Sequence, residues 1–133
     1  MNIRVGFGFD VHQLKDGLDF WLGGILVPHS KGGLGHSDAD VLVHTICDAL
    51  LGAANLGDIG RHFPDNDSKY KGIDSKILLQ KVVKLIQNNG YEIGNIDSTG
   101  TEVLDNSPIT SSESIVEPVE NVDALVDSLD TVG

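Results

Sequence analysis

His36-Ser-Asp-Ala-Asp-Val-Leu-Val-His-Thr-Ile-Cys-Asp-Ala-Leu-Leu-Gly52 is the stretch around which this chain is organised, and its pattern predicts one helix. Ser37 is the expected N-cap, with Asp40 able to reach back to it, and Gly52 is the expected stop. Asp40, His44 and Asp48 follow one another at i, i+4, which places an imidazole between two carboxylates on consecutive turns. An apolar stripe lies on a different line and would face a core; it consists of Leu42, Ile46, Ala49, Leu50 and Ala53.

Length and composition set the broad class of the protein. A chain of 133 residues is large enough for one domain with a core. Its single cysteine, Cys47, excludes an internal disulfide and fits a reducing cytoplasm, or a plastid stroma after removal of a targeting segment. No stretch has the length and hydrophobicity of a signal peptide core or a membrane span, so no membrane partner is expected.

Charge is distributed unevenly and suggests a boundary near residue 100. Residues 1–99 carry 12 acidic and 9 basic side chains, whereas residues 100–133 carry 8 acidic and none basic. Because no basic stripe is present to neutralise phosphates, a nucleic-acid partner is not expected. We predict a folded domain over residues 1–99 and a flexible acidic tail over residues 100–133.

A strictly alternating segment, Ile3 to Phe9, predicts a half-buried strand with its glycines on one face. If the alternation continues, Asp10 and His12 lie on that glycine face and point the same way as two potential metal ligands. The alternative is a turn aspartate followed by a surface histidine, because Asp-x-His alone is weak evidence.

The remaining elements indicate a mixed α/β, or α+β, fold in which helices pack on one face of a sheet. A hairpin is expected over residues 20–27 around Gly23-Gly24, a helix capped by Asp74 or Ser75, and a strand over residues 91–97. Between the two helices, residues 55–67 form an irregular acidic loop. This loop could hold an anion or a cation, or could be a simple surface turn.

Taken together, five motifs closely resemble the 2C-methyl-D-erythritol 2,4-cyclodiphosphate synthase family, over about residues 3–97. They are Gly8-Phe-Asp10-Val-His12, His36-Ser-Asp-Ala-Asp40 with His44, Asp48-Ala-Leu-Leu-Gly52, Gly57-Asp-Ile-Gly60 and Phe63-Pro-Asp65-Asn-Asp67. The resemblance implies a protomer of a homotrimer, with active sites between subunits. From Gly100 onward we find no match, and the threonine-rich segment with Glu and Lys typical of the family is missing.

The resemblance also implies roles for individual residues. Asp10, His12 and His44 match the catalytic Zn2+ ligands, a donor set that suits an open catalytic site. His36 matches the residue that stabilises the transition state. Independently of the resemblance, the spacing of Asp40 and Asp48, one turn either side of His44, predicts that they orient His44 by accepting its free ring N–H. Mg2+ on the substrate diphosphate is a further expectation. The substrate-binding positions implied by the match are Asp10, Val11, His12, His36, Ser37, Asp58, Ile59, Gly60, Phe63, Pro64, Asp65, Asn66 and Asp67.

The implied activity is that of a phosphorus–oxygen lyase of non-mevalonate isoprenoid biosynthesis. It would cyclise 4-diphosphocytidyl-2C-methyl-D-erythritol 2-phosphate to 2C-methyl-D-erythritol 2,4-cyclodiphosphate and release CMP. Two alternatives stay open from the residues themselves. One is a metal-dependent phosphohydrolase, since the same ligands could activate water. The other is a truncated protein that binds zinc and diphosphates without turnover.

Overall fold

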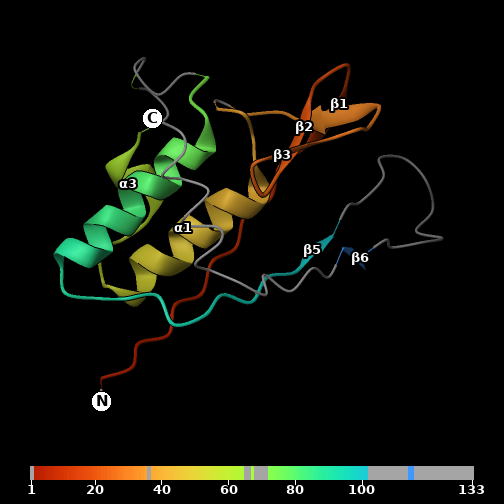
Figure 1. The fold of residues 1–133 in the computed structure, drawn as a ribbon. Coiled ribbons are helices and arrows are strands. Elements are labelled where there is room, and N and C mark those ends of the chain that lie inside the picture. The colour runs from red at the N-terminus through yellow and green to blue at the C-terminus, as the bar shows by residue number, and fades with distance from the viewer. Residues whose placement is uncertain (1, 36, 65–66, 68–71, 102–113, 116–133) are drawn as a thin grey trace.

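The computed structural model describes residues 2–35, 37–64, 67, 72–101 and 114–115. Along the described residues four short strands come first, three helices follow, and two very short strands come last (Figure 1). The helices are α1 (Val41–Ala53), α2 (Ile59–His62) and α3 (Ser75–Asn88). The strands are β1 (Leu14–Asp16), β2 (Phe20–Leu22), β3 (Ile25–Val27), β4 (Lys31–Gly33), β5 (Gly100–Thr101) and β6 (Ser114–Ile115).

The core lies between α1 and α3, which run side by side in Figure 1. Each helix contributes an apolar stripe at helical spacing, and the two stripes bury one another. The most buried members of this cluster are Val43, Ile46, Cys47, Leu51, Leu79, Val82 and Val83. Burial raises the pKa of the Cys47 thiol, which makes it a packing residue rather than a nucleophile. Packing of α1 on α3 therefore holds the first turn of α1 in a fixed place.

The ends of α1 differ from the sequence prediction. Asp40, not Ser37, is the N-cap, and its Oδ1 accepts a hydrogen bond from the backbone N–H of Val43 at 3.0 Å. At the other end Gly52 lies inside the helix, and Asn55 takes the left-handed conformation with φ 57°. The Asn55 N–H then bonds to the Gly52 carbonyl and the Leu56 N–H to the Leu51 carbonyl, which is a Schellman motif.

Four short strands form two antiparallel pairs next to α1. The hairpin β2–β3 is confirmed, with Gly23 and Gly24 both at positive φ in its tight turn. β1 pairs with β4 to form the second ribbon. The backbone N–H groups of Gly23 and Gly24 donate to the two carboxylate oxygens of Asp40, at 3.0 and 2.6 Å. One aspartate therefore caps α1 and fastens the hairpin to it.

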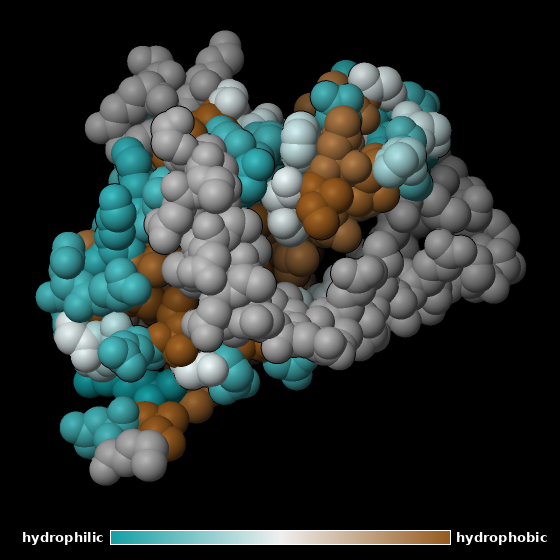
Figure 2. All heavy atoms as spheres, in the orientation of Figure 1, coloured by the Kyte–Doolittle hydropathy of each residue, from teal (hydrophilic) through white to brown (hydrophobic). Residues whose placement is uncertain are grey.

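The N-terminal segment keeps the predicted alternation but not the predicted strand. Residues 2–13 form no strand and pair with none of the described strands, each of which pairs with one other strand. The glycine face rests on α1, and the opposite apolar face is exposed, for example 90% at Val5 and 85% at Phe7. Figure 2 shows hydrophobic surface along this segment in the lower part of the view. The prediction of a half-buried strand is therefore wrong for this face of the described structure.

The fold class is α+β, as predicted, with helices beside small antiparallel ribbons instead of one continuous sheet. Residues 91–97 form no strand either, although Ile93 and Ile96 pack against the core. The Arg4 guanidinium lies 5.2 Å from the centre of the Tyr91 ring, so the N-terminal segment also contacts the chain after α3. Of the helices described, none is long and apolar enough to cross a membrane.

Candidate metal centre

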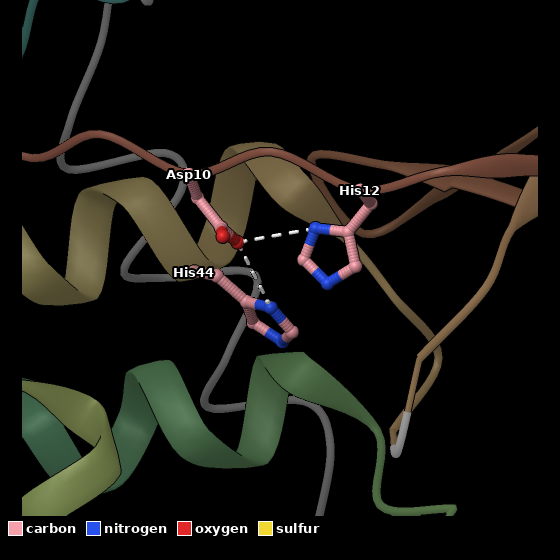
Figure 3. A group of neighbouring side chains, drawn as sticks. All are labelled: Asp10, His12 and His44. Carbon is pink, nitrogen blue, oxygen red and sulfur yellow. Dashed lines mark ion pairs between the residues drawn. The ribbon is translucent and has the colours of Figure 1, made fainter.

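Asp10, His12 and His44, the residues that the resemblance implies as metal ligands, converge at the N-terminal end of α1 (Figure 3). One carboxylate oxygen, Asp10 Oδ2, lies 3.2 Å from His12 Nδ1 and 3.4 Å from His44 Nδ1. The ring centres of His12 and His44 are 5.3 Å apart. One potential ligand atom from each residue lies within 4.8 Å of the other two. Asp10 and His12 come from the N-terminal segment and His44 from the first turn of α1.

Two glycines allow the N-terminal segment to approach α1 closely enough for this convergence. A Cβ atom added to Gly6 would lie 1.8 Å from the Ala49 carbonyl oxygen, and one added to Gly8 would lie 2.0 Å from that of Thr45. No side chain fits into these distances, so glycine is required at both positions. Asp10 and His12 follow on the same face and are thereby brought to His44.

The electrostatics of the cluster favour a charged carboxylate next to imidazole. Burial of Asp10 by itself raises the pKa of its carboxyl, but close contact with His12 and His44 and their charge outweigh it. The pKa of Asp10 is therefore held below its usual range. Contact with Asp10 in turn raises the pKa of His12, against an opposing contribution from burial. A divalent cation could take the place of the proton that this cluster attracts.

The residues present fit a metal ion by their chemistry as well as by their position. His12 Nδ1 is buried and makes no hydrogen bond of good geometry, although the carboxylate is near. A buried polar atom without a partner is costly, and a metal ion would satisfy it. Two imidazoles and one carboxylate with a position left open are the donor set of a catalytic zinc site. Within the described residues, this is the group of potential ligands that comes together.

The prediction that Asp40 and Asp48 receive the free ring N–H of His44 is wrong. Asp40 uses its oxygens on the backbone of the hairpin and of α1, as described above. Asp48 accepts a hydrogen bond at 2.9 Å from the backbone N–H of Ile59 at the start of α2. Burial raises the pKa of Asp48, while this hydrogen bond opposes the rise. Spacing along a helix predicted that both carboxylates would bond to His44. Each of them instead accepts hydrogen bonds from backbone N–H groups of other elements, Asp40 from the β2–β3 hairpin and Asp48 from the start of α2.

Instead, His44 Nε2 meets two serine hydroxyls, Ser75 Oγ at 2.8 Å and Ser37 Oγ at 3.2 Å. Ser75 is fully buried, and both its hydroxyl and its backbone N–H donate to the carboxylate of Asp38. The sequence analysis missed Ser75 and Asp38. No local pattern could have found them as partners, because 37 positions separate the two residues.

The other predicted site residues occupy the loops around α2 or lie outside the described structure. Asp58 is the N-cap of α2, with its side chain accepting from the Arg61 N–H at 3.0 Å. Val11 is 72% exposed. Phe63 ends α2 and packs against the core, together with Ile59, while Gly60 lies within α2 and the Asp67 N–H bonds to the Pro64 carbonyl. The predicted residues outside the described part of the chain are His36, Asp65 and Asn66.

Comparisons with known proteins agree with the resemblance seen in the sequence. The sequence model of the YgbB family matches residues 3–109. A relative from Bacteroides fragilis named 2-C-methyl-D-erythritol 2,4-cyclodiphosphate synthase is 73% identical over 99 residues, which is 74% of this chain. A relative of the same name from Cytophaga hutchinsonii is 50% identical over 129 residues, covering 92% of this chain and 81% of its own length.

Solved structures give the same picture. A structure titled as 2C-methyl-D-erythritol-2,4-cyclodiphosphate synthase in a CDP-bound form superposes with a TM-score of 0.64 at 33% identity, covering 97% of this chain and 79% of its own. The present chain spans 62% of the length of the Bacteroides fragilis relative. The family match runs to residue 109, and the Cytophaga hutchinsonii relative aligns over 92% of the chain, so the prediction that nothing matches from Gly100 onward is wrong. The domain boundary at residue 99 and the flexibility of residues 100–133 stay predictions.

Proposed function

The chain belongs to the YgbB family, and we propose that it catalyses the reaction for which its relatives are named. That reaction forms 2C-methyl-D-erythritol 2,4-cyclodiphosphate, with the cytidine-diphosphate-linked methylerythritol 2-phosphate as substrate and CMP as the second product. The observation that carries the proposal is the convergence of Asp10, His12 and His44 on one point. Family membership tells which reaction such a centre would serve.

The proposed reaction requires little proton transfer by side chains of the protein. An oxygen of the substrate's own 2-phosphate bonds to the β-phosphorus, the bond from that phosphorus to the bridging oxygen breaks, and CMP leaves with this oxygen. Because the nucleophile is already an anion, no strong general base is needed. Zn2+ held by Asp10, His12 and His44 would supply a Lewis acid for the diphosphate. We assign His36 the role of stabilising charge on the phosphate oxygens, and Mg2+ a place on the same diphosphate.

The loops near the centre are proposed to hold the substrate. Ser37 is half-buried, and its hydroxyl lies 3.2 Å from His44 Nε2, the ring nitrogen that does not face Asp10. We assign Ser37 to the substrate phosphates because it matches the family motif next to His36. Asp58 fixes the first turn of α2 and leaves its carboxylate exposed. A carboxylate at this position suits the hydroxyls of a methylerythritol better than a phosphate. The exposed Val11 and the segment from Ile59 to Asp67 complete the proposed binding surface.

Incubation of the zinc-loaded chain with the authentic substrate tests the proposal. Mass spectrometry should detect the cyclic diphosphate together with an equal amount of CMP. Release of inorganic phosphate would instead identify a phosphohydrolase. If neither product forms at full zinc loading, the chain is a zinc- and diphosphate-binding protein without turnover, and the proposed activity is refuted.

We further propose that the chain works as a homotrimer in the cytoplasm. The exposed apolar face of the N-terminal segment supports association, because isolated domains rarely leave such a row of side chains in water. Its members are Ile3, Val5, Phe7, Phe9 and Val11, each at least 72% exposed. Sedimentation equilibrium should give three times the chain mass, and Phe7→Glu should lower it. A monomeric wild-type chain would refute the trimer.

A further inference from the structure

The two ring nitrogens of His44 have different polar partners. Its ring is buried, and each nitrogen faces a different kind of group. Nδ1 lies 3.4 Å from Asp10 Oδ2, on the side of the metal centre. Nε2 lies 2.8 Å from the hydroxyl of Ser75, the first residue of α3. A neutral imidazole carries one proton, so one of these nitrogens donates and the other offers a lone pair.

The direction of the hydrogen bond between Ser75 and His44 follows from counting protons. A serine hydroxyl has one proton, and the Ser75 hydroxyl donates it to Oδ1 of Asp38. The Ser75 backbone N–H donates to Oδ2 of the same carboxylate at 2.8 Å, and the Asp40 N–H donates to Oδ1 at 3.1 Å. An ionised carboxylate only accepts hydrogen bonds. The Ser75 oxygen is therefore left as an acceptor toward His44.

We propose that Ser75 and Asp38 are positioning residues that hold His44 as the tautomer with its proton on Nε2. The lone pair of Nδ1 is then aimed at Asp10 and the metal centre. This inference rests on the proposed function, because it assigns the ligand atom of that same centre. The Ser37 hydroxyl, at 3.2 Å from Nε2, can share the same N–H. Since Ser75 begins α3 and His44 lies on α1, the helix pair of the core sets the tautomer.

Asp38 is the residue whose replacement separates this role from simple helix capping. In Asp38→Asn, with the amide nitrogen in the place of Oδ1, the side chain donates to the Ser75 oxygen and gives up the bond from the Asp40 N–H, which frees the Ser75 proton for His44 Nε2. The ring then carries its own proton on Nδ1, where it blocks the metal. We expect zinc affinity to fall by about 10- to 100-fold, the usual loss when a partner behind a metal ligand is changed.

Asp74→Asn is the matched control. Asp74 is the N-cap of the same helix and accepts from the Lys76 N–H at 2.9 Å, without contact to His44. Both variants replace a carboxylate that accepts a backbone N–H from the first turn of α3, so a merely structural role predicts similar effects. Zinc affinity is measured by competition with a chromophoric chelator. Equal affinities in the two variants would overturn the proposal, and a selective loss in Asp38→Asn supports it.

A second measurement needs no variant of the network and no metal. In the metal-free wild-type chain labelled with 15N-histidine, long-range 1H–15N spectra at pH 8 report which ring nitrogen carries the proton. His44→Gln identifies the His44 signals by their loss. A protonated Nε2 and an unprotonated Nδ1 are expected, and the reverse pattern refutes the inference. Absence of zinc binding or of product formation would count against the proposed function, while this spectrum decides the tautomer independently.

Discussion

Replacement of Gly8 by alanine should separate Asp10 and His12 from His44 without unfolding the core. The new Cβ atom would lie 2.0 Å from the Thr45 carbonyl oxygen, whereas Cβ atoms essentially never approach within 3.0 Å of another heavy atom. The segment must therefore move away from α1 by about 1 Å. Asp10 and His12 follow two and four residues later and move with it, away from His44. Metal–ligand distances tolerate only about 0.2 Å, so such a shift removes ligands.

We expect the zinc dissociation constant of Gly8→Ala to rise by at least about 100-fold, which corresponds to about 2.8 kcal/mol. Gly94→Ala is the control, since a Cβ atom there meets nothing within 4 Å. Chelator competition gives the dissociation constants, and far-UV circular dichroism checks that both variants keep their helices. If Gly8→Ala binds zinc as tightly as Gly94→Ala, the packing of the glycine face on α1 does not position the ligands, and the reasoning fails.

Three further predictions concern the same centre and the core. His44→Ala should abolish zinc binding in calorimetry, whereas His62→Ala, whose ring bonds to the Leu56 carbonyl, should bind like wild type; equal binding would reject the ligand assignment. Zinc affinity should fall as pH drops below the raised pKa of His12, by up to about tenfold per pH unit for one displaced proton; pH-independent affinity would exclude this competition. The Leu51 side chain is fully buried between α1 and α3. Leu51→Ala should lower the free energy of unfolding, measured in urea, by about 2–5 kcal/mol, and a loss under 1 kcal/mol would contradict that packing.

Several features could be predicted from the sequence because they depend on neighbours along the chain. The Gly23-Gly24 turn fixes its hairpin by the positive φ that glycine tolerates. Asp74 caps α3 through the second N–H that follows it. Asp10 and His12 share the glycine face because side chains alternate in any extended segment, whether or not it pairs. Side chains of the N-terminal segment therefore alternate between two faces as predicted, although the segment forms no strand in the described residues.

Other features were decided by groups far apart in the chain. The prediction that Ser37 is the N-cap of α1 was wrong. Asp40 is the N-cap, and its carboxylate also accepts hydrogen bonds from the backbone N–H groups of the hairpin glycines, 16 and 17 residues earlier. Strand pairing of the N-terminal segment needs a partner edge, which its own alternation cannot supply. The apolar face of the predicted half-buried strand is therefore exposed in the described chain.

The sequence by itself, through its family resemblance, named the expected metal ligands, and the tertiary structure decided how one of them is held. Asp-x-His and a lone helical histidine are weak signals, so it is the family resemblance that marks Asp10, His12 and His44 as a set of ligands. Each of these three is nevertheless visible in its own segment. The partner of His44 is not, because Ser75 lies 31 positions away and reaches the ring only when α3 packs on α1. A hydrogen bond depends on distance and direction in space, and for residues this far apart only the packing of the two helices sets both.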